Sequence, residues 1–393
     1  MTRVRLANEG VEFVEGCAQR LLSWLLEAAC PLWSTRGVDA LRGGFQEALT
    51  LSGEASDEAR RARVPPRQVF AFSCASRLGW QGDAQGVVTR GLHDFLSRYR
   101  RPDGLYRTLV AGDGTPLDER AFLYDQAFAL LGFAAAASWS SERSLDIVAE
   151  GEKLRRALMR HLKRPGAGFE TGLPYPQPLL SNPHMHLLEA ALEWLDVGGG
   201  AEWQSLADEV GELALRRFID PVTGMLHESF DEHWIRTDNL AGQLIEPGHQ
   251  FEWAWMLMRW GARRADAREA ALRLIDVAEK YGVHGGVAVN AIVNDTSIHD
   301  GSARLWPQTE RLRAAALAAR LYGEVRYWKM AGEAAESLLR YLDTDVPGLW
   351  YDRRTASGEF VRENVPAGNL YHIVGAIREL VALWRSAGPG VKH

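Results

Sequence analysis

The chain of 393 residues is poor in lysine, with five lysines against forty arginines, and it has only three cysteines. Cys17, Cys30 and Cys74 lack the spacing of metal ligands, and an odd number of cysteines argues against a secreted disulfide framework. No basic block occurs, which argues against a nucleic-acid surface. No run approaches the roughly 18–20 apolar residues of a membrane span, and the N-terminus lacks the apolar core of a secretory signal. We therefore expect a cytoplasmic protein that uses neither nucleic acid nor membrane as a partner.

The residues that are abundant indicate a folded protein with a large core. The chain is 46% hydrophobic and 24% charged, with a formal net charge of −6, which excludes the composition of a disordered segment. Its length suits two or three domains or one large repetitive domain. The fourteen tryptophans are unusual. Aromatic faces beside polar residues suit a sugar-binding site as well as a core.

A short glycine-containing segment recurs along the chain. The six copies are GGFQEAL at Gly44, DGLYRTL at Gly104, GAGFETG at Gly168, TGMLHES at Gly224, HGGVAVN at Gly286 and GLWYDRR at Gly348. The intervals between these glycines are 60, 64, 56, 62 and 62 residues. Glycine permits positive φ, and the flanking residues favour strands, so each copy is predicted to be a turn with a short β-like segment.

Two helical patterns separate successive copies of this segment. The predicted pairs are 67–79 with 85–99, 120–139 with 144–162, 183–195 with 202–218, 247–263 with 266–281 and 305–322 with 325–342, and single helices at about 12–33 and 368–385 complete the set. Short connections within pairs imply antiparallel neighbours. The pattern predicts an all-α fold: a closed (α/α)6 barrel of twelve helices in six hairpins, forming a single catalytic domain over residues 1–393. An open α-solenoid is the alternative.

Polar residues occupy the same position in each repeat, at the start of its first helix. These starts read RQVFAFS from Arg67, YDQAFALLG from Tyr124, NPHMHLLE from Asn182, EPGHQFEWAW from Glu246, LWPQTE from Leu305 and NLYHIVGA from Asn369. Each lies 14–23 residues beyond the glycine of its repeat. In a barrel this register brings all six starts together at one end, near the axis.

Histidine and carboxylate side chains within these motifs indicate acid–base chemistry. His186 with Glu189, and His249 with Glu252, are i, i+3 pairs and hence neighbours on a helix. A carboxylate beside an imidazole fixes its tautomer and prepares it for proton transfer. For any one pair, the alternative is a buried histidine that has a hydrogen-bond partner and only a structural role. Three converging histidines could also hold zinc, although no HExxH motif is present.

Other positions add binding groups rather than a cofactor site. Arg67 offers a fork of donors for sugar hydroxyls or a developing enediolate oxygen, although it could also be a structural ion-pair donor. Trp306 suits a platform for a sugar ring, whereas Trp253 and Trp255 are expected largely in the core. No nucleophile elbow, GxGxxG motif or phosphate loop occurs in the required context. We therefore expect no cofactor and no metal.

Together the motifs NPHMHLLE, EPGHQFEWAW, LWPQTE and NLYHIVGA resemble the N-acylglucosamine 2-epimerase superfamily, over nearly the whole chain. The flanking residues are most similar to its mannose isomerase and sulfosugar isomerase branch. The resemblance implies an (α/α)6 barrel, with His249 and His372 as the catalytic acid–base pair and Glu252 supporting His249. It places the substrate-binding positions at Arg67, Tyr124, Asn182, His186, Trp306 and Glu310.

The expected function is a cofactor-independent isomerase that interconverts D-mannose, or a related aldose, and D-fructose through a cis-enediolate. A sugar 2-epimerase would use the same two histidines and return the proton to the opposite face of carbon 2. A glycoside hydrolase on the same barrel would need two carboxylates about 5–9.5 Å apart, and a non-catalytic sugar-binding solenoid is a further alternative. The expected partner is a small monosaccharide, and the protein is expected to be a monomer or a homodimer.

Overall fold

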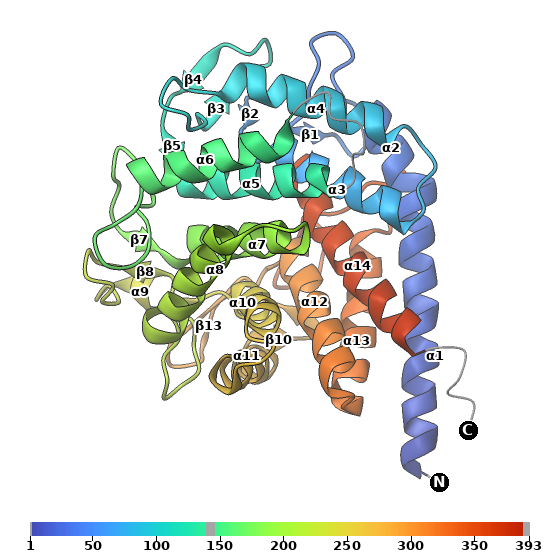
Figure 1. The fold of residues 1–393 in the computed structure, drawn as a ribbon. Helices are drawn as coiled ribbons and strands as arrows, with labels where there is room; N and C mark the ends of the chain where they lie inside the picture. The colour runs from blue at the N-terminus through green and yellow to red at the C-terminus, as the bar shows by residue number, and fades with distance from the viewer. Residues whose placement is uncertain (1, 139–145, 388–393) are drawn as a thin grey trace.

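The computed structural model describes residues 2–138 and 146–387, with side chains from residue 10 onward. Within these ranges six helices form an inner ring, in which each helix packs against two others (Figure 1). In ring order they are α3 (Val64–Leu78), α5 (Leu123–Ala137), α7 (Ser181–Asp196), α10 (Pro247–Trp260), α12 (Leu305–Tyr322) and α14 (Leu370–Ser386), and α14 packs back against α3.

An outer layer of helices covers this ring. It consists of α1 (Thr2–Ser23), which continues through η1 (Trp24–Ala29) into α2 (Cys30–Thr35), and of α4 (Ala84–Tyr99), α6 (Ile147–His161), α8 (Ala201–Leu213) with η2 (Ala214–Phe218), α11 (Ala265–Val277) with η3 (Ala278–Gly282), and α13 (Val325–Tyr341). The predicted closed (α/α)6 barrel is thereby confirmed. Residues 139, 144 and 145, at two predicted helix ends, lie outside the described residues.

The composition of the two layers explains why one is inside. In the inner helix α5, LYDQAFALLGFAAAA, residues 125–136 are all buried, as expected for a helix that is apolar on nearly every side. The outer helix α6 buries only one stripe, formed by Gly151, Leu154, Ala157 and Leu158. Its N-terminus is capped by the Asp146 carboxylate, which accepts a hydrogen bond from the backbone N–H of Ala149 at 3.0 Å.

Short antiparallel ladders join each repeat to the next at one end of the ring. In each, the strand before an inner helix pairs with a strand that follows a repeat glycine. The pairs are β2 (Arg60–Arg61) with β3 (Leu109–Val110), β5 (Ala121–Phe122) with β6 (Gly172–Leu173), β7 (Leu179–Leu180) with β8 (Ser229–Phe230), β9 (Leu244–Ile245) with β12 (Ala291–Val293), β14 (Ala303–Arg304) with β15 (Arg353–Arg354), and β16 (Val365–Pro366) with β1 (Ala48–Leu49). The last ladder joins the end of the chain to its beginning and closes the ring.

The remaining elements are small additions to the loops at this end. They are β4 (Pro116–Asp118), β10 (Val283–His284), β11 (Val287–Ala288), β13 (Ile298–Asp300), the short helix α9 (Leu240–Gln243) and the 3-10 turn η4 (Ala367–Asn369). All six repeat glycines have positive φ, between 74° and 95°, as the sequence predicts.

Glutamine side chains attach the glycine segments to the inner helices. Gln126 accepts a hydrogen bond from the Tyr106 backbone N–H and donates one to the Tyr106 carbonyl, both at 2.8 Å. Gln308 makes the same two bonds with Ala288, also at 2.8 Å. Each glutamine thus binds both backbone groups of one residue in its glycine segment, and these groups remain hydrogen-bonded after burial.

Several tryptophans are buried in the core, and they include the predicted core residues Trp253 and Trp255. The three cysteines are buried and unpaired. None of the described helices combines the length and apolar character that crossing a bilayer requires.

Candidate active site

A cavity of about 630 Å³ opens at the end of the ring where the six inner helices begin. The three residues predicted to be catalytic, His249, His372 and Glu252, line this cavity. The predicted binding residues Arg67, Tyr124, Asn182, His186 and Trp306 line it as well. Glu310 is the exception, because it is fully buried behind His372 and does not line the cavity.

His249 is held by a carboxylate that the sequence analysis does not single out. Its Nδ1 lies 2.9 Å from Oε1 of Glu228 and 3.9 Å from Oε2 of Glu246. Among the described residues no hydrogen bond or ion pair joins His249 to Glu252, whose carboxylate lies 3.8 Å from His186 instead. Burial alone lowers the pKa of His249, but the negative charges of Glu228 and Glu246 outweigh it and raise the pKa to about 10. His249 is therefore protonated at neutral pH.

His372 has the opposite electrostatic environment, although it also contacts a carboxylate. Its Nδ1 lies 2.8 Å from Oε1 of Glu310, and Oε2 of Glu310 accepts a hydrogen bond from Arg313 at 2.9 Å. Burial, followed by the positive charges of Arg67 and Arg313, holds the pKa of His372 well below its usual range. His372 is therefore neutral at physiological pH.

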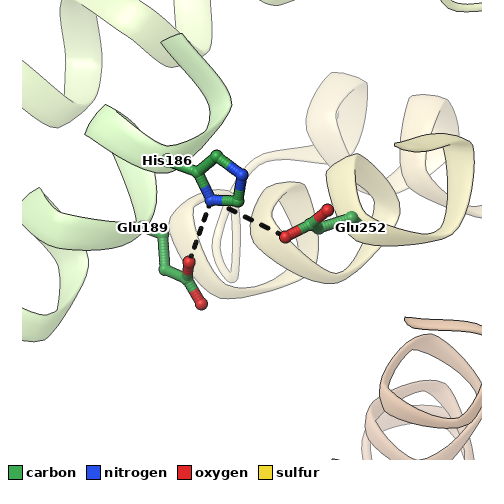
Figure 2. A group of neighbouring side chains, drawn as sticks. All are labelled: His186, Glu189 and Glu252. Carbon is green, nitrogen blue, oxygen red and sulfur yellow. Dashed lines mark hydrogen bonds and ion pairs between the residues drawn. The ribbon is translucent and has the colours of Figure 1, made fainter. Parts of the chain in front are cut away.

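His186 lies between two carboxyl groups, one from its own helix and one from α10 (Figure 2). Its Nδ1 is 3.4 Å from Oε2 of Glu189 and 3.8 Å from Oε1 of Glu252. Burial lowers the pKa of His186 to about 4 despite these neighbours. The predicted pairing of His186 with Glu189 is thus confirmed.

A buried cluster of charges lies beneath the cavity. Arg313 of α12, which is fully buried, bridges Glu189 at 2.7 Å and Glu310 at 2.9 Å, and its guanidinium lies 3.8 Å from the centre of the Trp255 ring. Tyr371 also donates a hydrogen bond to Glu189. Glu252 has no such partner: its buried Oε1 makes no hydrogen bond, and burial together with the charges of Glu310 and Glu189 raises its pKa well above the usual value.

Arg67 projects from the first turns of α3 and forms no ion pair with any residue that the structure describes. It donates a hydrogen bond to the Tyr124 hydroxyl at 2.6 Å, and its guanidinium lies 3.9 Å from the centre of the Phe128 ring. Its Nε is buried without a partner. A positive charge without a carboxylate partner therefore faces the cavity.

Trp306 lies between the two histidines at the start of α12. Its ring centre is 4.9 Å from that of His249 and 5.8 Å from that of His372, with an interplanar angle of 36° in both cases. The indole is only partly buried, in contrast to Trp253 and Trp255. This placement fits the predicted platform for a sugar ring.

Two groups of side chains have donor atoms close enough together to hold a metal ion, namely His186, Glu189 and Glu252, and Glu252, Glu310 and His372. Arg313 already contacts a carboxylate of each group, and its positive charge opposes a cation there. His184, the other histidine of the NPHMHLLE motif, has a structural role. Its Nε2 accepts a hydrogen bond from the Phe169 backbone N–H at 3.0 Å.

Several residues of the site lie outside the six helix-start motifs. Glu228 follows the repeat glycine Gly224, and Asp352 follows Gly348, so both come from the glycine segments rather than the helix starts. Asp352 lines the cavity, and burial raises its pKa to about 6. Arg313 lies three residues after Glu310, one helical turn deeper. The β7–β8 ladder holds Glu228 at the start of α7, and no helix-start motif signals its contact with His249 of α10.

Comparison with known proteins agrees with this site. The chain matches the model of the N-acylglucosamine 2-epimerase (GlcNAc 2-epimerase) family over residues 43–376, and it belongs to that family. It is 45% identical over 372 residues to a mannose-6-phosphate isomerase of Rhizobium meliloti (strain 1021), covering 92% of this chain and 96% of the relative. It is 24% identical over 369 residues to a D-mannose isomerase of Marinomonas mediterranea, covering 86% and 91%.

The fold is shared with solved structures of sugar-converting enzymes. The structure of cellobiose 2-epimerase from Spirochaeta thermophila DSM 6192 superimposes with a TM-score of 0.85 at 19% identity, over 95% of this chain and 98% of that one. Family membership and the relatives together indicate an enzyme of the sugar isomerase and epimerase class. The resemblance recognised in the sequence motifs is thereby confirmed.

Proposed function

We propose that the protein is a cofactor-independent aldose–ketose isomerase that interconverts D-mannose, or a related aldose, and D-fructose. The observation that carries the proposal is the pair of histidines on either side of Trp306, one protonated and one neutral. Two titratable groups whose surroundings push their pKa values apart make a matched acid and base. His249 and His372 form such a pair across one sugar-sized space.

In the proposed reaction the cyclic sugar first opens, with a proton moving from the hemiacetal hydroxyl to the ring oxygen. Neutral His372 then removes the proton on carbon 2 of the open aldose, while protonated His249 donates a proton to the carbonyl oxygen on carbon 1. The product of this step is a cis-enediol. His372 returns its proton to carbon 1, His249 recovers one from the hydroxyl on carbon 2, and the ketose forms with no net change in protons.

Positive charge and hydrogen-bond donors around the cavity stabilise the enediolate character of this intermediate. Arg67 has no carboxylate partner to weaken its charge, and protonated Glu252 can donate its O–H to a substrate oxygen. All six inner helices also begin at this end, and helix N-termini favour negative charge. Because proton transfer by a positioned side chain contributes roughly 10²–10⁴-fold, these donors have to supply the remaining stabilisation.

The arginines at the cavity mouth favour an uncharged sugar over a phosphorylated one. Arg63 is 2.9 Å from Asp125, Arg304 is 3.3 Å from Glu246, and Arg61 is paired with Glu47. Each of these cations is therefore already neutralised by a carboxylate. A phosphate group would need arginines that are free to form bidentate bonds, and of the lining arginines only Arg67, which donates to the Tyr124 hydroxyl, has no carboxylate partner.

The 2-epimerase is the second candidate, because it needs the same acid and base. It differs only in returning the proton to the opposite face of carbon 2. A glycoside hydrolase is disfavoured because it would leave His186, His249 and His372, which all line the cavity, without a role.

Incubation with D-mannose in deuterium oxide, followed by NMR, tests the proposal. We expect D-fructose with deuterium on carbon 1, whereas glucose with deuterium on carbon 2 would identify the epimerase. His249→Ala and His372→Ala should each lose roughly 10²-fold or more in exchange rate, and His299→Ala, at an exposed position of strand β13, serves as the control. Full exchange in either histidine variant would refute the assigned pair.

Two further arms of the same experiment test the substrate and the absence of a cofactor. Mannose 6-phosphate should be converted with a much lower kcat/KM than mannose, and the reverse order would show that the mouth arginines bind phosphate. Exchange should continue after exhaustive treatment with a chelator. Its loss, with recovery on adding back one divalent metal, would contradict a metal-free reaction.

A further inference from the structure

The two histidines of the cavity share one arrangement and differ in one contact. Each presents Nδ1 to a carboxylate from another part of the ring: His249 of α10 to Glu228, beside β8, and His372 of α14 to Glu310 of α12. The Nδ1–carboxylate distances are nearly equal, at 2.9 and 2.8 Å. The nature of the contact therefore does not explain why one histidine is charged and the other neutral.

The difference lies in what else binds each carboxylate. Glu310 forms an ion pair with Arg313 at 2.9 Å, and both side chains are fully buried. Glu228 forms no ion pair with an arginine or lysine of the described chain; its second oxygen instead accepts a hydrogen bond from the Ser181 hydroxyl at 2.8 Å. A carboxylate already neutralised by a guanidinium attracts a proton on its histidine much less than an unneutralised one.

Glu228 is held in a fixed position beside His249 by hydrogen bonds to the start of α7. Its carbonyl accepts a hydrogen bond from the Ser181 backbone N–H at 3.1 Å, next to the β7–β8 ladder that pairs Leu180 with Ser229. Ser181, the first residue of α7, is fully buried. Both carboxylate oxygens of Glu228 thus have fixed partners, and the Nε2 edge of His249 is left to face the cavity.

We propose that Glu228 and Arg313 are positioning residues that divide the acid and base roles between the two histidines. Glu228 holds His249 in the protonated, acid form, and Arg313 keeps His372 in the neutral, base form by neutralising Glu310. The effect of these two residues on turnover rests on the proposed function. The protonation states themselves are properties of the protein without substrate.

Other titratable and charged groups face the two histidines, and not all act in the same sense, because Glu189 raises the pKa of His372 and Arg304 partly neutralises Glu246 beside His249. Around His249 these are Glu246 at the start of α10, Glu252 within α10, and Arg304 of β14, which pairs with Glu246. Around His372 they are Arg67 of α3, Glu189 of α7 and the charged His249 itself. Arg67 and His249 both disfavour a second positive charge on His372, so the protonation of one histidine reinforces the neutrality of the other.

The experiment follows the histidine ring nitrogens of the substrate-free protein by ¹⁵N NMR over a range of pH. His249→Gln and His372→Gln serve to assign the two signals. In the wild type, His249 should stay protonated to about pH 10, whereas His372 should remain neutral down to acidic pH. Titration of both rings together near pH 6–7 would overturn the proposal without any variant.

Glu228→Gln keeps the shape of the side chain and removes its charge. We expect the midpoint of His249 to fall by roughly 2 units or more, and the basic limb of the kcat profile to move down with it, because the acid loses its proton at lower pH. Glu228→Asp, which keeps the charge, should restore part of both shifts. An unchanged His249 midpoint in Glu228→Gln would show that Glu228 has only a structural role.

Arg313→Gln should have the opposite effect at the other histidine, raising the midpoint of His372, with Arg313→Lys as the charge-preserving control. Should Arg313→Gln fail to fold, the wild-type titration and the Glu228 variants still decide the question. The NMR result is independent of turnover. If the midpoints move as expected while no sugar is converted, the proposed function fails and this inference stands.

Discussion

Glu189 and Glu252 carry the same chemical group beside the same histidine, and their ligand oxygens lie within 4.8 Å of each other. Their surroundings differ. Arg313 and Tyr371 donate to Glu189, and its pKa is lowered because the attraction of Arg313 outweighs the effect of burial. The pKa of Glu252 is raised because the side chain is buried and lies near the carboxylates of Glu310 and Glu189. The chain therefore keeps one carboxyl ionised and the other protonated side by side.

Replacing each of these carboxyls by its amide should change stability in opposite directions. Because the folded-state pKa of Glu252 is raised, its ionisation opposes folding as pH rises above the unfolded value of about 4.3. Glu252→Gln removes this opposition and should be about 1 kcal/mol more stable than wild type at pH 8, with no gain near pH 4. The same variant should lose activity, since the acidic O–H disappears.

Glu189→Gln is the matched change with the opposite sign. A lowered pKa contributes stability above the unfolded value, and that contribution is lost as pH falls through the folded one. The variant leaves Arg313 with one carboxylate fewer and should lose about 3 kcal/mol at neutral pH. Urea unfolding at pH 4 and pH 8 measures both variants. Equal effects of the two substitutions at pH 8 would contradict the assigned protonation states.

At this scale the sequence predicted which residues face the cavity better than which residues they contact. The helix-start register brought His186, His249 and His372 together because the repeat determines where each helix begins. The Nδ1 of His249 contacts Glu228 rather than Glu252, because i, i+3 spacing fixes neighbours on a helix surface but not the direction in which each side chain turns. Glu228 is 21 residues from His249 and reaches it through a ladder that no local pattern reveals.

Side-chain hydrogen bonds join the inner helices to the glycine segments, and this arrangement repeats along the chain although the residues that make the bonds differ. Gln126, Gln250 and Gln308 each accept a hydrogen bond from the backbone of a glycine segment. His184 has the same role in the third repeat. The sequence predicted the helices and turns of this scheme from glycine and proline positions. It did not predict these bonds, because a buried glutamine and a buried histidine share no recognisable motif.

Close packing between α3 and α5 depends on Gly132. A Cβ at this position would lie 2.7 Å from Cβ and 2.9 Å from Cα of Pro66, next to Arg67. Gly132→Ala should therefore destabilise the protein by about 1–3 kcal/mol, although alanine is the better helix former by about 1 kcal/mol. It should also raise KM, because α3 carries Arg67 against Tyr124.

Gly16→Ala on α1 is the control for this substitution, because a Cβ there meets nothing within 4 Å. It should stabilise the protein by up to about 1 kcal/mol and leave KM unchanged. Thermal unfolding and steady-state kinetics of the two variants measure these effects. A stabilised Gly132→Ala with normal KM would show that the two inner helices can separate without moving the site.

The closed ring distinguishes the whole molecule from an open solenoid, which the sequence pattern alone allowed. Closure depends on contacts between residues from the two ends of the chain: β16 with β1, α14 with α3, and the Gln68 side-chain amide, which donates to the Ala367 carbonyl at 2.6 Å. Periodicity fixes the number of repeats but not the angle between them. The sequence therefore could not predict that β1 pairs with β16, with Ala48 opposite Pro366.

A substitution at the seam of the ring tests whether closure stabilises the molecule as a unit. Phe70 of α3 is fully buried, with its ring 5.2 Å from that of Tyr371 on α14, and Phe70→Ala should cost about 3–5 kcal/mol. In a closed ring each inner helix has two neighbours, so hydrogen exchange should accelerate in α7, across the ring, as much as in α3 and α14. Phe133→Ala within α5 should give the same pattern. Faster exchange confined to α3 and α14 in the seam variant would instead indicate nearest-neighbour unfolding of the kind expected for a solenoid.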